Sequence, residues 1–223
     1  MGSIAENLLR TQRNIPSGVE LIVVSKFKPV EAIMEAYQAG QRVFGENKAQ
    51  EMTTKQEQLP QDIQWHFIGH LQTNKVKYIV PYVTLIHSVD SEKLLEEINR
   101  LAKKNNRIVD CLLQFHIAKE DTKFGFSLQE AKNMLDSDSF KDYCHIRLCG
   151  VMGMATFTDN EMQIRSEFRT LKEYFIQLKE TYFPQADYFK EISMGMTDDY
   201  RIAIEENSTM VRIGSAIFGN RTI

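Results

Sequence analysis

The chain has 223 residues, 43% of them hydrophobic and 26% charged, an ordinary globular composition that argues against intrinsic disorder. Lys and Arg total 27 and Asp and Glu total 30, so the formal net charge of −3 predicts neither a nucleic acid nor an anionic membrane as a partner. Short apolar runs, an N-terminus without a signal pattern and only three cysteines lead us to expect a protein of the reducing cytoplasm.

Predicted strands and helices alternate along the chain. The residues from Ser3 to Glu6 form a capping box, which predicts an extra helix at the N-terminus. The predicted strands are short runs rich in apolar and β-branched residues, at 19–26, 42–47, 65–70, 85–89, 109–117, 145–155, 188–193 and 210–218. Helical patterns fall between them, at 29–40, up to about 58, up to about 81, 94–102, 128–135, after 155 up to 182, and 198–206.

Eight strand–helix units of about 28 residues each fill the 223 residues. Strands that alternate with helices predict right-handed βαβ units and a parallel sheet. We therefore expect an α/β protein whose residues 1–223 form a single domain, a closed (β/α)8 TIM barrel near the lower end of its usual size. An open doubly wound sheet is the alternative on the element count alone.

Lys26 ends the first predicted strand, after four apolar residues. In a parallel barrel the active site lies where the strands end, so polar residues at these ends are the candidates for chemistry. One interpretation is a lysine that keeps its charge in water at the barrel mouth. The other is a Schiff-base amine, whose pKa must fall from about 10.4 to about 7, a change worth roughly 4.6 kcal/mol that burial supplies in part.

The ends of the seventh and eighth predicted strands help to decide between these interpretations. In many barrels the loops after these strands bind phosphate. Gly195 and Gly214 permit close approach of the backbone, and Ser193 and Ser215 add hydroxyl donors. Arg212 lies within an apolar strand, where its guanidinium needs a partner, either a structural carboxylate or a ligand.

A lysine amine after the first strand and an anion cup after the last two strands face the same mouth. The ligand that this arrangement predicts carries a carbonyl and a phosphate. Pyridoxal 5'-phosphate (PLP) has both groups, and so has a phosphorylated sugar bound by a class I aldolase. The residues alone leave both ligands open.

Five motifs in a fixed order then make the chain recognisable. They are Val24-Ser25-Lys26, Phe44-Gly45-Glu46-Asn47, His66 through Lys75, Gly150-Val151-Met152-Gly153-Met154, and the stretch from Ser193 to Gly214. Together they resemble the pyridoxal phosphate homeostasis protein family from about residue 20 to the C-terminus. The resemblance implies a fold-type III PLP-binding barrel, similar to the N-terminal domain of alanine racemase. It also implies that PLP is held as a Schiff base on a lysine and serves intracellular PLP homeostasis, without established catalytic turnover.

The resemblance assigns roles to residues motif by motif. Lys26 is the Schiff-base lysine, Asn47 lines the pocket near the ring, and Arg212 faces the pyridine nitrogen. The phosphate cup is made, partly by main-chain N–H groups, from Ser193, Met194, Gly214 and Ser215. A permanent cation beside the ring nitrogen disfavours its protonation, and an unprotonated pyridine is a weaker electron sink. No catalytic residue and no metal ligand is implied.

Some positions depart from the usual pattern or carry weaker signals. Lys48 stands where family members often have Tyr, which puts a ring contact there in doubt. Asn207 replaces a common Gly, and Asn tolerates the left-handed cap that Gly usually fills. Lys123 is expected to be an exposed loop lysine, with a secondary phosphate or aldehyde site as the alternative. His66 and His70 are expected to form hydrogen bonds near the mouth and not to bind a metal.

Three functions stay open at this point. The first is a non-catalytic PLP carrier, monomeric, with apo PLP-dependent enzymes as candidate recipients. The second is a racemase-like PLP enzyme, which needs a second proton-transfer group opposite the lysine. In alanine racemase that group comes from the partner's second domain, for which we expect no counterpart in this chain. The third is a class I aldolase-like enzyme on a sugar phosphate.

Overall fold

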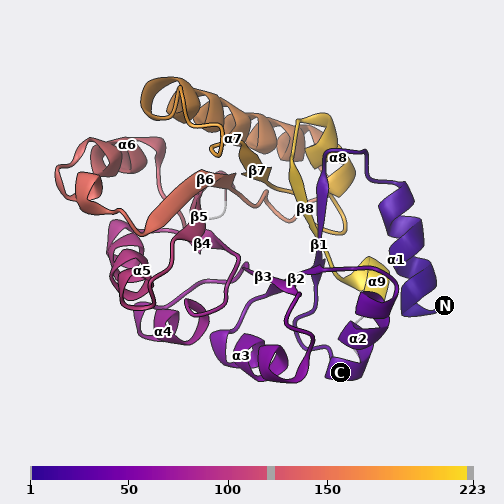
Figure 1. Cartoon of the computed structure of the whole chain (residues 1–223). Helices are drawn as coiled ribbons and strands as arrows, with labels where there is room; N and C mark the ends of the chain where they lie inside the picture. The colour runs from indigo at the N-terminus through magenta and orange to yellow at the C-terminus, as the bar shows by residue number, and fades with distance from the viewer. Residues whose placement is uncertain (1, 120–123, 220–223) are drawn as a thin grey trace.

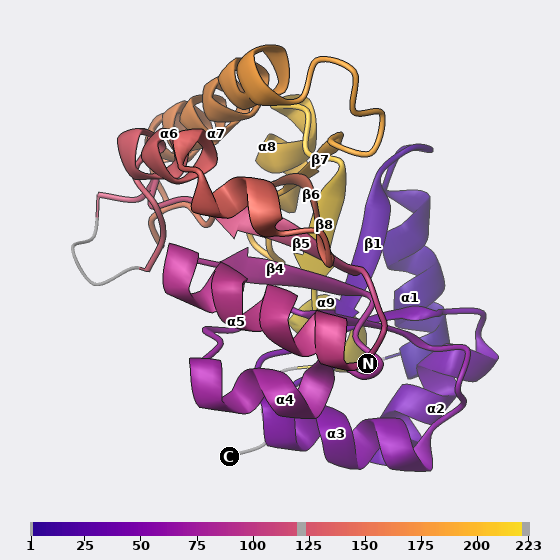
Figure 2. The ribbon, with the colours of Figure 1, turned by 60° about the vertical axis from the view of Figure 1, so that its left-hand side comes forward.

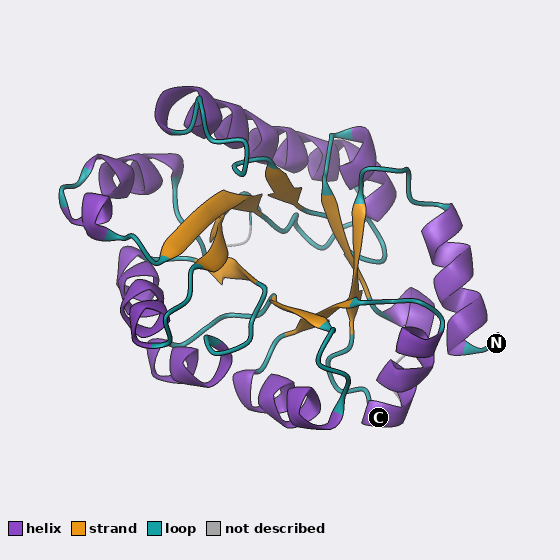
Figure 3. Cartoon of the chain, in the orientation of Figure 1, coloured by secondary structure: helices purple, strands orange, loops and turns teal. Residues whose placement is uncertain are grey.

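Eight parallel strands close into a barrel in the order of the chain, β1 to β8, and β8 pairs with β1. The computed structural model describes residues 2–119 and 124–219. The strands are β1 (Glu20–Val24), β2 (Val43–Glu46), β3 (Gln64–Phe67), β4 (Leu85–Val89), β5 (Val109–Gln114), β6 (Ile146–Met152), β7 (Glu191–Ser193) and β8 (Met210–Ile213). They form the central ring in Figures 1 and 3. The expected barrel is confirmed, and the open sheet is excluded.

Helices surround this ring. They are α1 (Ile4–Arg13), α2 (Val30–Gln38), α3 (Ala49–Gln58), α4 (Val76–Ile79), α5 (Glu92–Lys104), α6 (Leu128–Asp136), α7 (Glu161–Tyr182), α8 (Tyr200–Glu205) and α9 (Ser215–Phe218), with short 3-10 turns at Thr73–Lys75 and Ser139–Asp142. In Figure 2, α6 and α7 cover one side of the barrel, and α3 and α4 cover the opposite side. None of the described helices is long and apolar enough to cross a membrane.

The apolar residues form two layers. The larger cluster fills the space between strands and helices, and the predicted apolar stripe of α5, from Leu94 to Ala102, is buried in it. A smaller cluster lies within the barrel and consists of Ile22, Leu85, Leu112, Cys149, Met152 and Met210. Because side chains alternate between the two faces of a strand, the same strands supply both layers.

The N-terminal helix begins as its sequence predicts. Ser3 accepts a hydrogen bond from the Glu6 N–H, and the Glu6 side chain accepts one from the Ser3 N–H, which is a complete capping box. The Asn7 side chain donates to the Ile217 carbonyl of α9 at 3.1 Å, so α1 lies beside the last described helix (Figure 1).

The strand boundaries were less well predicted than the strands themselves. The eighth strand ends at Ile213 and not at residue 218, because the chain turns at Gly214 into the short helix α9. Most other predicted strands are also too long, since their last residues belong to the loops at the barrel mouth.

Candidate functional site

A cavity of about 720 Å³ opens at the carboxyl ends of the strands. Five of the predicted site residues line it: Lys26, Asn47, Arg212, Gly214 and Ser215. They follow or end β1, β2 and β8, so the closed barrel brings together residues that are up to 189 positions apart (215 − 26). Its volume lies within the range of roughly 300 to 1,000 Å³ that small-molecule sites occupy.

The turn that carries Lys26 is held in an unusual backbone conformation. Phe27, the next residue, has a φ of 62°, in the left-handed region that residues other than Gly rarely adopt. Glu51 of α3 accepts the Phe27 N–H at 2.5 Å. This carboxylate therefore stabilises a turn that costs conformational energy, and strained backbone of this kind is concentrated at functional sites.

A buried lysine, Lys55, also stabilises this turn. Lys55 Nζ donates to the Ser25 carbonyl at 2.8 Å and to the carboxylates of Glu46 and Glu51, both at 2.7 Å. These three bonds use all three donors of the ammonium group. Burial raises the pKa of Glu46, although the nearby Lys55 charge opposes the shift. Sequence reasoning missed this cluster, although the Glu51–Lys55 spacing of four residues on a predicted helix was a signal for the pair.

A second lysine also lines the cavity but is held elsewhere. Lys28 Nζ donates to the backbone carbonyls of Phe218 and Gly219, at 3.3 and 3.2 Å. These bonds tie Lys28 to the end of α9. Of the two lysines at the cavity, Lys26 lies nearer to the end of β1.

Arg212 is almost fully buried, with 3% of its surface exposed, and still lines the cavity. Its two terminal nitrogens donate to the Ser193 hydroxyl at 2.6 Å and to the Gly153 carbonyl at 3.1 Å. Burial lowers the pKa of Arg212 to about 10, and the charge of Asp199 opposes that shift. The guanidinium is thus a cation held in place by neutral groups, with a buried carboxylate nearby.

Ser193 and Met194 are not among the residues that line the cavity. The Ser193 hydroxyl lies between His87 and Arg212, at 2.9 and 2.6 Å. The Met194 side chain is buried in the core and its N–H donates to the Met210 carbonyl at 3.2 Å. Both groups are engaged within the barrel wall, so neither presents a ready donor to the cavity.

The hydroxyls that do line the cavity come from Thr197 and Ser215. Ser215 Oγ donates to Thr197 Oγ1 at 3.1 Å, which joins the loop after β7 to the loop after β8. Gly195 precedes the first of these residues with a φ of +93°, a conformation that favours glycine. At Gly214 a Cβ atom would stand 2.9 Å from the Val24 carbonyl, so only glycine allows this close approach of β8 to β1.

The charges and polar atoms of the cavity suit an anionic ligand with a hydrogen-bonding ring. Among the described lining residues, Lys26, Lys28 and Arg212 are cationic, and Asp198 alone is acidic. Asn47 Oδ1 is buried and has no hydrogen-bond partner in the described ranges. A ligand that donates a hydrogen bond would satisfy this atom, because a buried polar atom without a partner is costly.

The rim of the cavity is partly aromatic, which sequence reasoning did not anticipate. His70 pairs with Asp90 at 2.8 Å and stacks on the Phe124 ring, with the ring centroids 4.0 Å apart. His70 therefore forms its hydrogen bond at the mouth, as predicted. His66 does not, because its side chain points into the barrel and lines a cavity at the opposite end.

The other weak sequence signals have different outcomes. Lys123 lies outside the described residues. The described ranges contain no group of three or more His, Cys, Asp or Glu side chains that could hold a metal ion. Asn207 has a φ of 72°, which confirms the expected left-handed conformation. Lys48 is exposed, and its Nζ lies 4.9 Å from the centre of the Phe27 ring.

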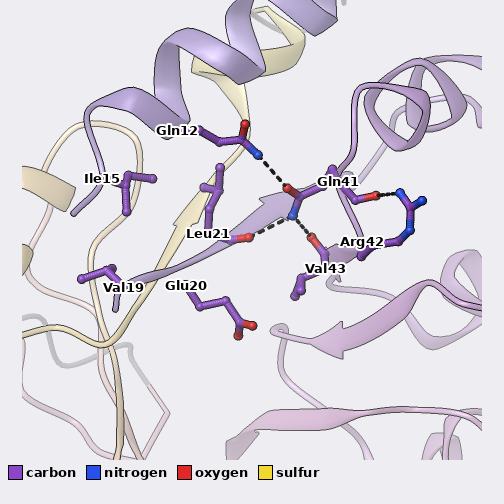
Figure 4. A pocket seen from close by; sticks show the side chains of 8 residues that line it. All are labelled: Gln12, Ile15, Val19, Glu20, Leu21, Gln41, Arg42 and Val43. Carbon is purple, nitrogen blue, oxygen red and sulfur yellow. Dashed lines mark hydrogen bonds between the residues drawn. The ribbon is translucent and has the colours of Figure 1, made fainter. Parts of the chain in front are cut away.

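A smaller cavity of about 270 Å³ lies beside α1, near the amino ends of β1 and β2 (Figure 4). Its central polar group is the Gln41 amide, which donates to the carbonyls of Leu21 and Val43 and accepts from the Gln12 amide. Figure 4 shows these bonds within the wall. Because the Gln41 amide is engaged, this cavity is a weaker candidate than the one at the carboxyl ends.

Comparison with known proteins agrees with this geometry. Residues 1–222 match the family model described as "Alanine racemase, N-terminal domain". The "Pyridoxal phosphate homeostasis protein" of Aquifex aeolicus is 39% identical over 203 residues, which cover 91% of this chain and 87% of that protein.

Two solved structures share the fold. PipY of Synechococcus elongatus PCC7942, solved with PLP bound, is 34% identical with a TM-score of 0.88, and the match covers 97% of this chain and 100% of that one. Alanine racemase of Bartonella henselae, with covalently bound pyridoxal phosphate, shares the fold at a TM-score of 0.73. It is 14% identical, and the match covers 99% of this chain but 60% of the racemase.

Proposed function

This chain belongs to the pyridoxal phosphate homeostasis protein family, and from that premise we propose that it binds PLP in the cavity at the carboxyl ends of its strands, with Lys26 as the attaching amine. The observation that carries the proposal is the convergence of Lys26, Asn47 and Arg212 on one cavity of predominantly cationic lining. Bound PLP supplies an aldehyde that reacts reversibly with amines. In this proposal residues 1–223 form a single domain, and this domain binds PLP.

The loops after β7 and β8 bind the phosphate in this proposal. When the phosphate binds, it replaces Thr197 as the acceptor of the Ser215 proton, so that both hydroxyls donate to the phosphate, and Gly214 lets the backbone approach it. Charge-assisted bonds of this kind are among the stronger ones in proteins. Ser193 and Met194 do not contact the phosphate in this proposal. They stabilise the end of β7, Ser193 by accepting a hydrogen bond from Arg212 and Met194 by packing in the core.

Arg212 is assigned to the ring nitrogen. Its guanidinium is fixed by Ser193 and Gly153 and stays a donor, so the nitrogen opposite it must be an acceptor. A cation there disfavours protonation of the ring and weakens its capacity to accept electrons. The residue therefore favours storage of the cofactor over carbanion chemistry.

We propose a carrier and not a racemase. The relatives named for PLP homeostasis have about the length of this chain, whereas the racemase that shares the fold is much longer. The proposed carrier is a cytoplasmic monomer that releases PLP to apo PLP-dependent enzymes.

Two measurements on the purified protein test this function. Titration with PLP should produce a saturable absorption band of bound cofactor. In D₂O, the PLP-loaded protein should then leave the α-proton of amino acids unexchanged. Robust deuterium incorporation would favour the racemase alternative, and absence of a bound-PLP band would reject the binding proposal.

A further inference from the structure

A line of hydrogen bonds runs through the barrel from the proposed cofactor cavity to its opposite end. Arg212 Nη1 bonds to Ser193 Oγ at 2.6 Å, and Ser193 Oγ bonds to His87 Nδ1 at 2.9 Å. His87 Nε2 then bonds to His66 Nδ1 at 3.0 Å. The four residues come from β8, β7, β4 and β3, so the closed barrel alone brings them together.

The chemistry of arginine gives this line a direction. A guanidinium has only donors, so Arg212 donates to Ser193. The Ser193 hydroxyl then donates to His87 Nδ1, the other partner that it has in the described part of the chain. His87 consequently carries its proton on Nε2 and donates to His66 Nδ1. His66 carries its own proton on Nε2.

The surroundings keep both imidazoles neutral. His87 is fully buried and His66 is 3% exposed. Burial lowers the pKa of His66 to about 3 and the pKa of His87 well below its usual value, and the charge of Arg212 adds to the shift at His87. A neutral His87 is required, since an imidazolium could not accept the Ser193 proton.

The far end of the line reaches a separate cavity of about 320 Å³ at the amino ends of the strands. His66 lines it, and its Nε2 has no hydrogen-bond partner among residues 2–119 and 124–219. Arg212 lines the cofactor cavity, and the line thus spans the barrel between its two openings. Apolar side chains at these positions would be sufficient to pack the core, so the four polar residues call for another explanation.

We propose that His87 is a positioning residue for the cofactor. It accepts the Ser193 hydroxyl proton and so turns the Ser193 lone pairs toward Arg212, which fixes the guanidinium opposite the ring nitrogen of PLP. Without His87 the hydroxyl is free to rotate and Arg212 loses a fixed acceptor. This inference rests on the proposed function, because it needs PLP in the cavity at the carboxyl ends.

The test compares PLP with its 1-deaza analogue, in which a C–H replaces the ring nitrogen. A hydrogen bond to a charged group is worth about 1.5–3 kcal/mol, so the wild-type protein should prefer PLP by roughly 10- to 100-fold. In His87→Leu this preference should fall to within about threefold. His87→Asn should keep most of it, because the Asn carbonyl oxygen accepts where Nδ1 did. His145→Asn, remote from the cavity, is the matched control and should leave the preference unchanged.

The outcomes separate this inference from the proposed function. A wild-type protein without preference overturns the contact between Arg212 and the ring, and the inference with it. A wild-type preference that His87→Leu leaves intact overturns the inference alone. Should that variant fail to fold, ¹⁵N NMR of the wild-type histidines decides. A neutral His87 protonated on Nε2 supports the inference, and one protonated on Nδ1, or charged, contradicts it.

Discussion

Glu51 accepts the backbone N–H of Phe27, so a carboxylate on α3 secures the turn just after Lys26. Lys55 binds the same carboxylate, together with Glu46 and the Ser25 carbonyl. The cluster joins β1, β2 and α3 at one point. The position of the proposed PLP-binding lysine therefore depends on charged side chains that are not among the residues lining the cavity.

Loss of the Lys55 ammonium should be costly. Lys55→Met leaves the buried Glu46 without its cation, and breaking a buried pair in this way costs about 3–5 kcal/mol of unfolding free energy. Urea denaturation measures the loss, and PLP affinity should fall as well. Adding Glu46→Gln to Lys55→Met should restore part of the stability. Lys103→Met on the exposed face of α5 is the control, and an equal loss there would contradict the role of the cluster.

The two hydroxyls at the cavity should act on the phosphate alone. Ser215→Ala and Thr197→Ala should each weaken PLP binding about tenfold, as expected for one hydrogen bond to a charged group. Pyridoxal, which lacks the phosphate, should bind both variants as it binds the wild-type protein. Equilibrium dialysis with the two vitamers checks this, with Thr54→Ala on α3 as the control. Equal losses for both vitamers would speak against these residues as the phosphate site.

Acid should destabilise the barrel through its buried histidines. The folded-state pKa of His66, about 3, lies below the usual 6.5, so the native state binds fewer protons than the unfolded chain between these values. The free energy of unfolding therefore has its full value, as far as His66 is concerned, above pH 6.5, and it decreases as the pH falls toward 3. Each buried histidine should remove about 1.5 kcal/mol between pH 6.5 and 5.

His66→Asn isolates the contribution of one histidine. Its amide oxygen can still accept the bond from His87, but the side chain does not titrate. The variant should lose about half of the histidine-dependent decline in urea midpoints between pH 6.5 and 5. A decline as steep as that of the wild-type protein would show that His66 is not held neutral.

The barrel could be predicted because its signals are local and repeated. Each strand is a short apolar run, and the amphipathic stripe of α5 appears in the sequence as it lies in the core. The ends of the strands were harder to predict. Residues at the barrel mouth such as Ile217 are apolar and resemble strand residues in the sequence, although they belong to a helix.

The sequence indicated which residues lie at the cavity where a motif ends a strand, but it did not indicate contacts between distant segments. Lys26 and Arg212 are polar residues after or within apolar strands, a pattern visible in one dimension. Ser193 was expected in a phosphate cup, but its hydroxyl is taken up by His87 of β4, 106 residues earlier. No local spacing indicates that contact, since it depends on closure of the barrel.

Mass spectrometry after borohydride reduction of the PLP-loaded protein tests the central claim most directly. Reduction makes the lysine–PLP bond permanent, so peptide mapping identifies the attached residue. We predict one adduct, on Lys26, that is lost in Lys26→Ala and retained in Lys28→Ala, whose lysine lines the same cavity. An adduct that persists in Lys26→Ala, or that maps to Lys28 in the wild-type protein, would contradict the assignment.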